Sequence, residues 1–151
     1  MNKKIVVGAD HGGFELKERI KKYLEKSGYA ITDVGAYNKD SVDYPDIAVK
    51  ACNEYKSGNY DFGILFCGTG IGISIAANKI KGIRCAVIHN LFTAEMCKAH
   101  NNANFLALGG RIKYSVPVEK MLDKFIETSH EGGGRHEQRL NKIAALEMPE
   151  K

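Results

Sequence analysis

A cysteine beside a glycine-rich turn is the residue of this sequence best placed for chemistry. Cys67 follows the apolar run 64–66 and precedes Gly68, Gly70 and Gly72. The run predicts a buried parallel strand, the glycines a tight turn that can approach a ligand, and the segment after them a helix. Because the first amides of a helix have no internal partner, they favour an anion, including the thiolate of a cysteine. We therefore predict a reactive thiol in an anion-binding turn.

The same turn also has more ordinary explanations. A strand, a glycine turn and a helix recur in α/β proteins, and a buried cysteine is usually inert packing. The glycine spacing differs from the dinucleotide-binding fingerprint, since Ile73 occupies the place of the third glycine and Asn90 the place of the acidic residue. The position of Cys67 at the end of a strand is what favours the chemical interpretation.

A polar pair stands at the end of the first predicted strand. Asp10 and His11 follow a short β-branched run and precede two glycines. The pair fits a capping aspartate with an exposed histidine, or a carboxylate that orients substrate hydroxyls beside an imidazole that binds phosphate. Ligands of parallel sheets bind beyond the carboxyl ends of the strands, where Asp10 and Cys67 both stand. If the two strands are neighbours, both loops face one crevice.

Two further groups lie in the C-terminal half. His100 ends a predicted helix and opens the run His-Asn-Asn-Ala-Asn, which fits a favourable histidine at a helix C-terminus or a general acid–base. Arg135 and Arg139 are four residues apart after a triple glycine, so both guanidinium groups can lie on one helix face. This arginine pair fits either a solvated face or a phosphate site near the helix start.

Strands and helices alternate along the chain to position these groups. Strands are expected at 4–8, 29–34, 62–67, 84–88 and 105–108, and helices at 16–27, 45–57, 74–78, 91–101, 115–128 and 135–147. Repeated strand–helix units require a parallel sheet with helices on both faces. The predicted fold class is therefore α/β, a single-domain three-layer α/β/α sandwich with a five-stranded parallel sheet, Rossmann-like. One domain is expected over 1–151, with the C-terminal helix 135–147 after a glycine hinge.

Composition argues against several other classes of protein. The 151 residues are 44% hydrophobic and 26% charged, which is ordinary for a globular domain. The net charge of +4 comes without a basic run, so we expect no nucleic-acid partner. We expect no membrane partner and no signal peptide, since no apolar stretch approaches the ~18 residues of a membrane span. The four cysteines show neither CxxC pairing nor metal-ligand spacing, so we expect no metal. Cys52, Cys85 and Cys97 are interpreted as core thiols of a reducing, cytoplasmic compartment.

Six motifs occur in an order that is more specific than any one of them. They are Asp10-His-Gly-Gly-Phe-Glu-Leu-Lys17, Asp43-Tyr-Pro-Asp46, Cys67-Gly-Thr-Gly-Ile-Gly72, Ile75-Ala-Ala-Asn-Lys79, His100-Asn-Asn-Ala-Asn104 and Gly134-Arg-His-Glu-Gln-Arg139. Together they resemble the type B ribose-5-phosphate isomerase family, which includes galactose-6-phosphate and allose-6-phosphate isomerases. The resemblance extends over nearly the whole chain, from Ile5 to about Ile143.

The resemblance implies cofactor-free interconversion of D-ribose 5-phosphate and D-ribulose 5-phosphate through an enediolate, a step of the pentose phosphate pathway. Cys67 would be the base that moves the proton between C1 and C2, since Ile73 replaces the loop glutamate that some members use. Thr69 would pass protons between oxygens, and His100 would open the furanose ring while Asp10 binds hydroxyls. The implied substrate-binding residues are His11, Tyr44, Gly68, Gly70, Ile71, Gly72, Ser74, Asn101, Arg111, Arg135 and Arg139.

Among these substrate-binding residues, the resemblance gives separate roles to the side chains and to the main chain. His11, Arg111, Arg135 and Arg139 would hold the phosphate, Asn101 a sugar hydroxyl, and the amides of 68–74 the enediolate. The family forms homodimers, sometimes tetramers, with active sites shared between subunits. Two alternatives remain: an isomerase of allose 6-phosphate or galactose 6-phosphate, decided by pocket length, and a non-catalytic phosphosugar-binding protein. The second needs an anion site but no proton shuttle, so the joint presence of Cys67, Thr69 and His100 counts against it.

Overall fold

The computed structural model describes residues 3–149 and is built on a five-stranded parallel sheet. The strands are β1 (Lys4–Ala9), β2 (Ala30–Asp33), β3 (Phe62–Cys67), β4 (Cys85–Val87) and β5 (Phe105–Gly109). Their order across the sheet is β2-β1-β3-β5-β4, and every neighbouring pair is parallel. Because β1 and β3 are neighbours, the loops that follow them lie side by side, as the predicted crevice requires.

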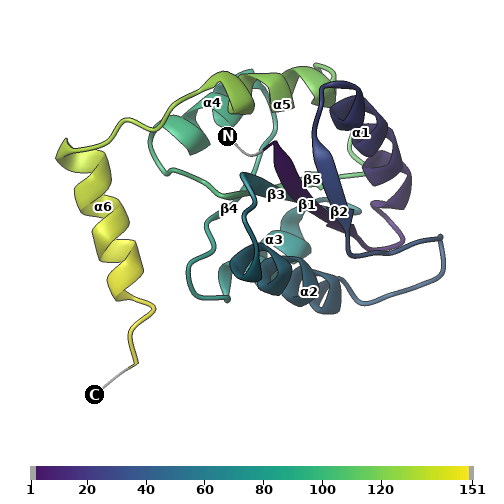
Figure 1. Ribbon diagram of the computed structural model, residues 1–151, viewed down its shortest axis with the longest axis horizontal. Helices are drawn as coiled ribbons and strands as arrows, with labels where there is room; N and C mark the ends of the chain where they lie inside the picture. Colours follow the sequence, from purple (N-terminus) through teal and green to yellow (C-terminus); the bar gives the residue numbers. More distant parts are fainter. Residues whose placement is uncertain (1–2, 150–151) are drawn as a thin grey trace.

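Helices cover both faces of the sheet, so the molecule has the three predicted layers (Figure 1). The helices α1 (Phe14–Lys26), α4 (Leu91–Ala99) and α5 (Val118–Glu127) pack on one face, where their apolar residues join β1, β3 and β5 in one hydrophobic cluster. The helices α2 (Tyr44–Ser57) and α3 (Ile71–Asn78) pack on the other face in a second cluster. The central strands β3 and β5 are buried on both faces, which explains their continuous apolar sequences.

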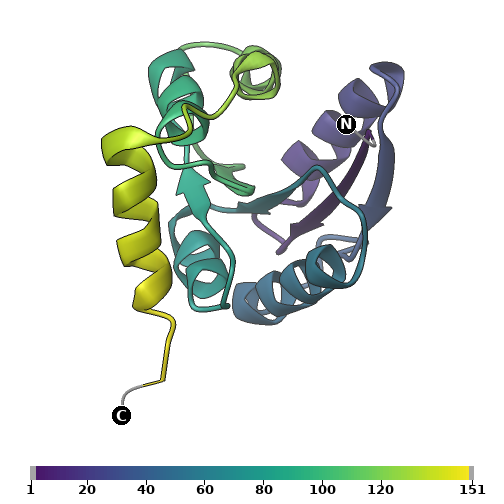
Figure 2. The same ribbon diagram turned by 60° about the vertical axis from the view of Figure 1, so that its left-hand side comes forward.

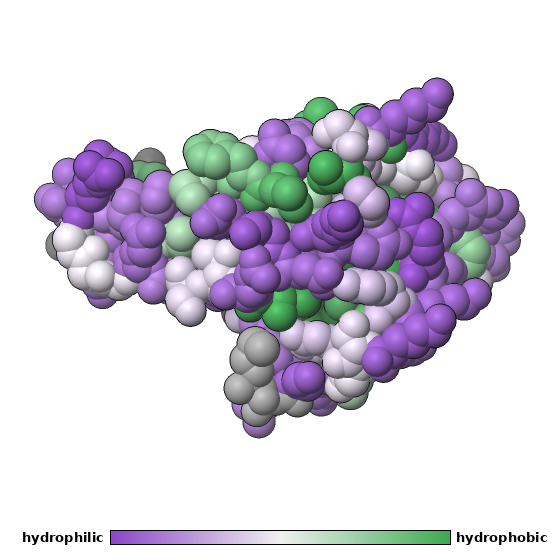
Figure 3. All heavy atoms as spheres, turned by 90° about the horizontal axis from the view of Figure 1, so that it is seen from above, coloured by the Kyte–Doolittle hydropathy of each residue, from purple (hydrophilic) through white to green (hydrophobic). Residues whose placement is uncertain are grey.

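The last helix, α6 (Gly134–Ala145), stands apart from these layers (Figures 1 and 2). None of its residues is buried. Leu140 and Ile143 face a hollow of about 490 Å³ that Asn101 and the segment after α3 also line. Viewed from the side of α4 and α5, the surface is mostly hydrophilic, with separate hydrophobic patches (Figure 3). The apolar side of this helix is therefore not fully covered by the rest of its own chain.

One charged side chain, that of Lys17, is completely buried in the core. Lys17 of α1 has no solvent-exposed surface, and its Nζ donates to both carboxylate oxygens of Asp33 at 2.8 Å. Its third partner is the carbonyl oxygen of Ala36. Burial alone would raise the pKa of Asp33, but hydrogen bonds from Lys17 and Lys21 outweigh it and lower the pKa below its usual value. The ion pair between Lys17 and Asp33 therefore holds α1 against the end of β2.

The predicted element order and fold class are confirmed, and the differences lie at element ends. The C-terminal helix runs over Gly134–Ala145 instead of 135–147. The helix expected at 115–128 begins only at Val118, because Pro117 with an extended backbone occupies its N-cap. The strand expected at 84–88 is reduced to Cys85–Val87, and the helix expected at 91–101 ends at Ala99. Shifts of this size are common where end residues lack a full set of hydrogen bonds.

Candidate active site

Three loops meet at the carboxyl end of the sheet, after β1, β3 and β5. The amide of Gly110 donates to the carbonyl of Cys67 at 2.8 Å, and the amide of Arg111 to the carbonyl of Gly68 at 2.9 Å. The loop after β1 is equally close, since a Cβ on Gly13 would lie 2.4 Å from the carbonyl carbon of Phe66. These contacts hold the three backbones in fixed positions, so groups placed on them are preorganised.

Cys67 is the last residue of β3, and its side chain faces the turn that follows. Only 4% of the residue is exposed, and its Sγ accepts a hydrogen bond from the amide of Gly70 at 3.0 Å. Gly70 is the N-cap of α3 and has a φ of +81°, a conformation that residues with a Cβ adopt only under strain. A thiolate at this position therefore has a main-chain donor in place.

The other three cysteines are buried thiols in the core. Burial raises the pKa of Cys52 and of Cys97 to about 12, and it also raises the pKa of Cys85. These thiols remain protonated at neutral pH and act as packing, in agreement with the prediction of core cysteines.

The start of α3 supplies further main-chain donors beside the sulfur. The first internal bond of this helix runs from the amide of Ser74 to the carbonyl of Gly70, at 3.2 Å. The amides of Gly72 and Ile73 come before that bond and are the orphan donors of a helix start. Thr69 Oγ1 accepts from the amide of Ile71 at 3.2 Å, which holds its hydroxyl at the turn. The turn thus brings main-chain donors and the Thr69 hydroxyl together, and its binding of an anion stays a prediction.

Asp10 and His11 are held by their own loops. Asp10 is 7% exposed, and its Oδ1 accepts from the amides of Gly12 and Gly13 at 2.9 and 3.1 Å. The amide of Val42 donates to Nδ1 of His11 at 3.3 Å. In the neutral imidazole this contact leaves the proton on Nε2, so His11 presents an N–H donor from its other nitrogen.

His11 and Arg111 line one small hollow of about 200 Å³ beside the cysteine loop, which we call the His11 hollow. Arg111 also lies against Gly68, where an added Cβ would be 3.1 Å from its Nη1. Lys39 lines the same hollow and forms an ion pair with Glu15. The hollow collects an imidazole, a guanidinium group and an ammonium group, a set of donors that suits a phosphate. Its remaining lining residues are Gly12, Glu15, Leu16 and Gly110, so one carboxylate, that of Glu15 paired with Lys39, also lines the hollow.

Tyr44, the first residue of α2, covers the same turn from the opposite side. A Cβ on Gly72 would lie 2.6 Å from the Cζ and 2.9 Å from the hydroxyl oxygen of Tyr44. The ring is therefore in contact with the start of α3, and its role in lining the substrate pocket stays a prediction.

His100 and Asn101 lie at the other edge of the sheet. Cys67 pairs with Gly109 at the end of β5, whereas Phe105 pairs with Gly63 at the beginning of β3. His100 precedes Phe105 because α4 carries the chain back along the sheet. A six-residue strand spans ~20 Å, so His100 of one chain lies far from Cys67 of the same chain.

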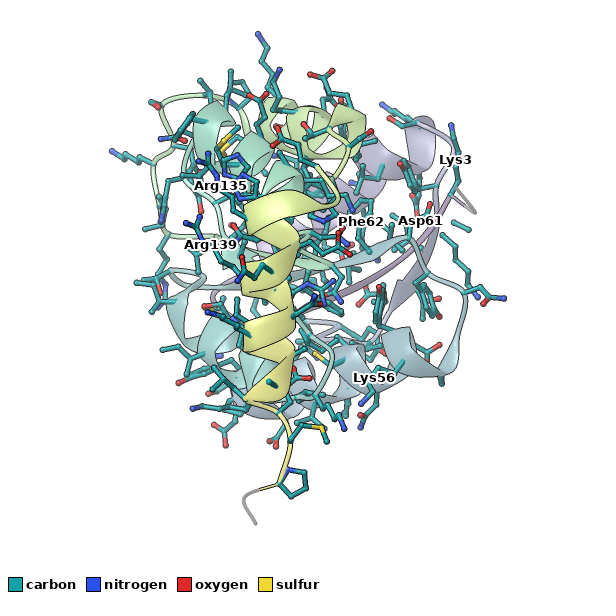
Figure 4. All side chains as sticks on the ribbon, turned by 90° about the vertical axis from the view of Figure 1, so that its left-hand side faces the viewer. Lys3, Lys56, Asp61, Phe62, Arg135 and Arg139 are labelled. Atoms are coloured by element: carbon teal, nitrogen blue, oxygen red, sulfur yellow. The ribbon has the colours of Figure 1, made fainter. Side chains whose placement is uncertain are left out.

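Arg135 and Arg139 are also at this far edge. Both are exposed and project to the same side of α6, as predicted from their spacing (Figure 4). Figure 1 places α6 at the opposite end of the molecule from α1, whose first turn lines the His11 hollow. A single chain therefore divides the predicted residues into two groups. The first group, at the cysteine turn, is Asp10, His11, Tyr44, Cys67, Gly68, Thr69, Gly70, Ile71, Gly72, Ser74 and Arg111, and the second is His100, Asn101, Arg135 and Arg139.

Three residues of potential importance were missed by the sequence analysis. Lys39 and Val42 belong to the loop between β2 and α2, which carries no strong local pattern, and only folding brings them to His11. His136 stacks on His100 with ring centroids 3.9 Å apart and planes inclined by 10°. Its place between the two arginines was visible in the sequence, but its partner lies 36 positions earlier.

Within residues 3–149, no helix has the length and apolarity that a membrane crossing needs.

Fold and site together define a class: a parallel α/β protein that presents a thiol, main-chain donors and basic side chains at the carboxyl edge of its sheet. Comparison with known proteins narrows the class. The family described as Ribose/Galactose Isomerase matches residues 5–143. Ribose-5-phosphate isomerase B of Escherichia coli is 41% identical over 146 residues, which cover 97% of each chain.

Solved structures agree with the family match. Ribose-5-phosphate isomerase B of Clostridium thermocellum superimposes with a TM-score of 0.91 at 46% identity, covering 95% of this chain and 97% of the other. The type B ribose 5-phosphate isomerase of Trypanosoma brucei gives 0.90 at 40% identity, covering 97% and 99%. This chain belongs to the ribose/galactose isomerase family. The predicted resemblance to type B enzymes, and with it the aldose–ketose isomerase class, is confirmed.

Proposed function

We propose that the protein interconverts D-ribose 5-phosphate and D-ribulose 5-phosphate through an enediolate, with Cys67 as the base. The observation that carries the proposal is the hydrogen bond from the Gly70 amide to Cys67 Sγ, beside a hollow lined by His11 and Arg111. In this role the enzyme serves the pentose phosphate pathway in the cytoplasm and needs no cofactor. Ribose phosphate is also the substrate in the names of the relatives described above.

The main chain of the cysteine turn is the proposed stabiliser of the enediolate. The hydrogen on the carbon next to a sugar carbonyl is weakly acidic, so the barrier falls chiefly when the developing oxyanion meets fixed donors. The amides at the start of α3 are such donors, and each can contribute ~3 kcal/mol to the transition state. Cys67 takes the proton from one carbon and returns it to the next, while the Thr69 hydroxyl moves a proton between the two oxygens.

Phosphate binding supplies the energy that positions the reacting carbons. His11 and Arg111 hold one side of the phosphate in the His11 hollow, with a donor on Nε2 of His11 and a guanidinium group on Arg111. Contacts made so far from the reaction are useful because their binding energy orients the sugar at Cys67.

The remaining groups reach this site from a second copy of the chain. His100, Asn101, Arg135 and Arg139 lie at the far edge of the sheet, so one chain alone holds an incomplete set. Under our proposal, a homodimer, or a tetramer built from it, brings His100 of one subunit to Cys67 of the other to open the furanose ring. The exposed apolar residues of α3, α4 and α6 support such an association: Ile71, Ile75, Leu91, Phe92 and Ile143. In such a dimer, α6 of the single domain proposed for residues 1–151 contacts the second subunit.

Solvent isotope exchange and turnover test the proposed reaction. In deuterium oxide, the purified protein should incorporate label at the substrate C–H position, and its kcat/KM for ribose 5-phosphate should exceed that for allose 6-phosphate or galactose 6-phosphate. A higher value for a six-carbon substrate would support the alternative that the family description allows. Phosphosugar binding without any exchange would overturn the enzymatic proposal in favour of a non-catalytic binder.

Mixing two inactive variants tests the shared site. Cys67→Ser and His100→Asn each remove one proposed group, and each homodimer should be inactive. If the sites are shared, a mixed dimer retains one intact site, so a statistical mixture recovers about a quarter of wild-type activity. If each site were built from one chain, the mixture would remain as inactive as its components, and the shared-site proposal would be wrong.

A further inference from the structure

Three side chains with metal-binding groups converge at the far edge of the sheet, in what we call the His100 cluster. It consists of His100 after α4, Glu131 in the segment before α6, and His136 in the first turn of α6. One ligand atom from each lies within 4.8 Å of the other two. Oε2 of Glu131 is 3.9 Å from Nε2 of His100 and 3.8 Å from Nε2 of His136. Both imidazoles thus turn the same nitrogen toward one carboxylate oxygen.

Main-chain contacts fix the cluster in place. The amide of Glu131 donates to the carbonyl of Ala99 at 2.8 Å, and Nδ1 of His130 lies 3.0 Å from the same oxygen. These bonds tie the segment before α6 to the end of α4. The amide of Gly133 also bonds to the Glu137 carboxylate, which holds the start of α6. The cluster is therefore a product of two anchored chain segments and not of one flexible loop.

The distances fit an open metal site better than a hydrogen-bonded triad. Separations of 3.8 and 3.9 Å exceed hydrogen-bonding distance, so neither imidazole donates to Glu131. Ligand atoms around a tetrahedral ion with bonds of ~2.0–2.1 Å are ~3.3 Å apart. The three ligand atoms lie within 4.8 Å of one another, so the widest of their separations has to close by up to ~1.5 Å to reach that geometry. The two imidazole rings, now stacked with planes inclined by 10°, must also rotate so that their nitrogen lone pairs converge on one ion. The exposed fractions of the side chains, 34% for His100 and 61% for Glu131, leave room for these rotations.

Charge also affects what the cluster can bind. Two imidazoles and one carboxylate are the ligand set that zinc-class ions prefer over magnesium or calcium. The nearby Arg135 and Arg139 repel a cation, so we expect micromolar affinity and not the tight binding of a structural zinc.

We propose that His100, Glu131 and His136 form a binding site for a divalent transition ion such as Zn²⁺, with water completing the coordination. The site joins the end of α4 to the start of α6 and lies outside the set of residues proposed for the sugar, except for His100. A bound ion occupies the imidazole of His100 and so inhibits ring opening. The inhibition rests on the function proposed above for His100, whereas ion binding does not.

Metal titration of the full-length protein, after dialysis against EDTA, tests the site directly. Zn²⁺ competition with a chromophoric chelator should give one ion per chain, and His136→Ala and Glu131→Gln should each weaken binding more than ~10-fold. His89→Ala is the matched control, because His89 is an exposed histidine outside the cluster, and it should bind as the wild type does. Equal affinities in His136→Ala and His89→Ala would overturn the site.

Cobalt spectroscopy separates this site from binding at Cys67. Co²⁺ held by nitrogen and oxygen shows visible absorption without a thiolate-to-metal charge-transfer band, and Cys67→Ser should leave that spectrum unchanged. A charge-transfer band that disappears in Cys67→Ser would assign the ion to the cysteine turn and overturn the proposal.

Turnover measurements decide the inhibitory part. Zn²⁺ should lower the isomerase activity of the wild type, EDTA should restore it, and His136→Ala should remain active and insensitive to Zn²⁺ at the same concentration. If the variants changed Zn²⁺ binding as predicted but Zn²⁺ left turnover undiminished, the proposed inhibition would be wrong and the proposed binding site would stand. If the protein proved inactive on every sugar phosphate, the titrations would still decide whether the site exists.

Discussion

Replacing Cys67 by serine and by alanine separates the proposed catalytic role of the thiol from its structural role. Serine has nearly the same shape, and its Oγ can accept the amide of Gly70 that now donates to Sγ at 3.0 Å. Its hydroxyl does not ionise near neutral pH, so it cannot act as the base. Alanine removes both the base and the acceptor. The two variants therefore share a catalytic defect but differ in stability.

The expected magnitudes follow from these contacts. A positioned general base contributes ~10²–10⁴-fold to rate, so kcat should fall by that factor in both variants, which is ~3–5 kcal/mol of transition-state stabilisation. Alanine also leaves the Gly70 amide without its acceptor in a site where Cys67 is only 4% exposed. An unsatisfied buried donor costs ~1–3 kcal/mol. For a domain of this size, that loss lowers the Tm by several degrees, at ~2–4 °C per kcal/mol.

The assay combines steady-state kinetics, isotope exchange and calorimetry. Both variants should lose turnover and deuterium incorporation while keeping their affinity for a phosphorylated sugar alcohol, which binds but cannot isomerise. Serine should melt near the wild type and alanine below it. Near-normal turnover in Cys67→Ser would refute the base assignment. Equal Tm values for serine and alanine would refute the structural importance of the bond from Gly70.

Three other predictions concern the phosphate, cofactors and the buried lysine. Arg135→Ala combined with Arg139→Ala should raise KM for ribose 5-phosphate with less effect on kcat, and an unchanged KM would remove both residues from the phosphate site. EDTA should leave isomerase activity intact, and a loss that added metal restores would contradict the cofactor-free proposal. Because the pKa of Asp33 is lowered on folding, its contribution to stability is present above the unfolded value of about 3.8 and is lost as pH falls through the lower folded pKa. Lys17→Met should accordingly cost about 3 kcal/mol at pH 7 and less at pH 3 in urea unfolding, whereas an equal cost at both pH values would contradict the role of the Lys17–Asp33 pair.

Local patterns made the fold and half of the site predictable. Strand ends, helix starts and glycine turns depend on residues a few positions apart, so Asp10 and Cys67 could be assigned to strand ends from their immediate neighbours. The alternation of strands and helices then required parallel pairing, and the carboxyl edge followed as the place for a ligand. The positions of Gly68, Gly70 and Gly72 around the thiol are of the same local kind.

Contacts between distant segments could not be predicted in this way. Three features join residues that share no local sequence pattern. They are the insertion of β5 between β3 and β4, the ion pair of buried Lys17 with Asp33, and the hydrogen bond from the Val42 amide to His11. Each depends on which faces pack together, which a periodicity does not specify.

The amino-acid sequence by itself determined the strand–helix alternation, the chemistry at each strand end and the family to which the motifs correspond. Only the tertiary structure decided where these groups lie relative to one another. Helices that return along a parallel sheet carry their C-terminal residues to the edge where strands begin, so His100 is separated from Cys67 by the length of a strand. The same return brings His100 against His136, a contact that arises because α6 starts beside the end of α4.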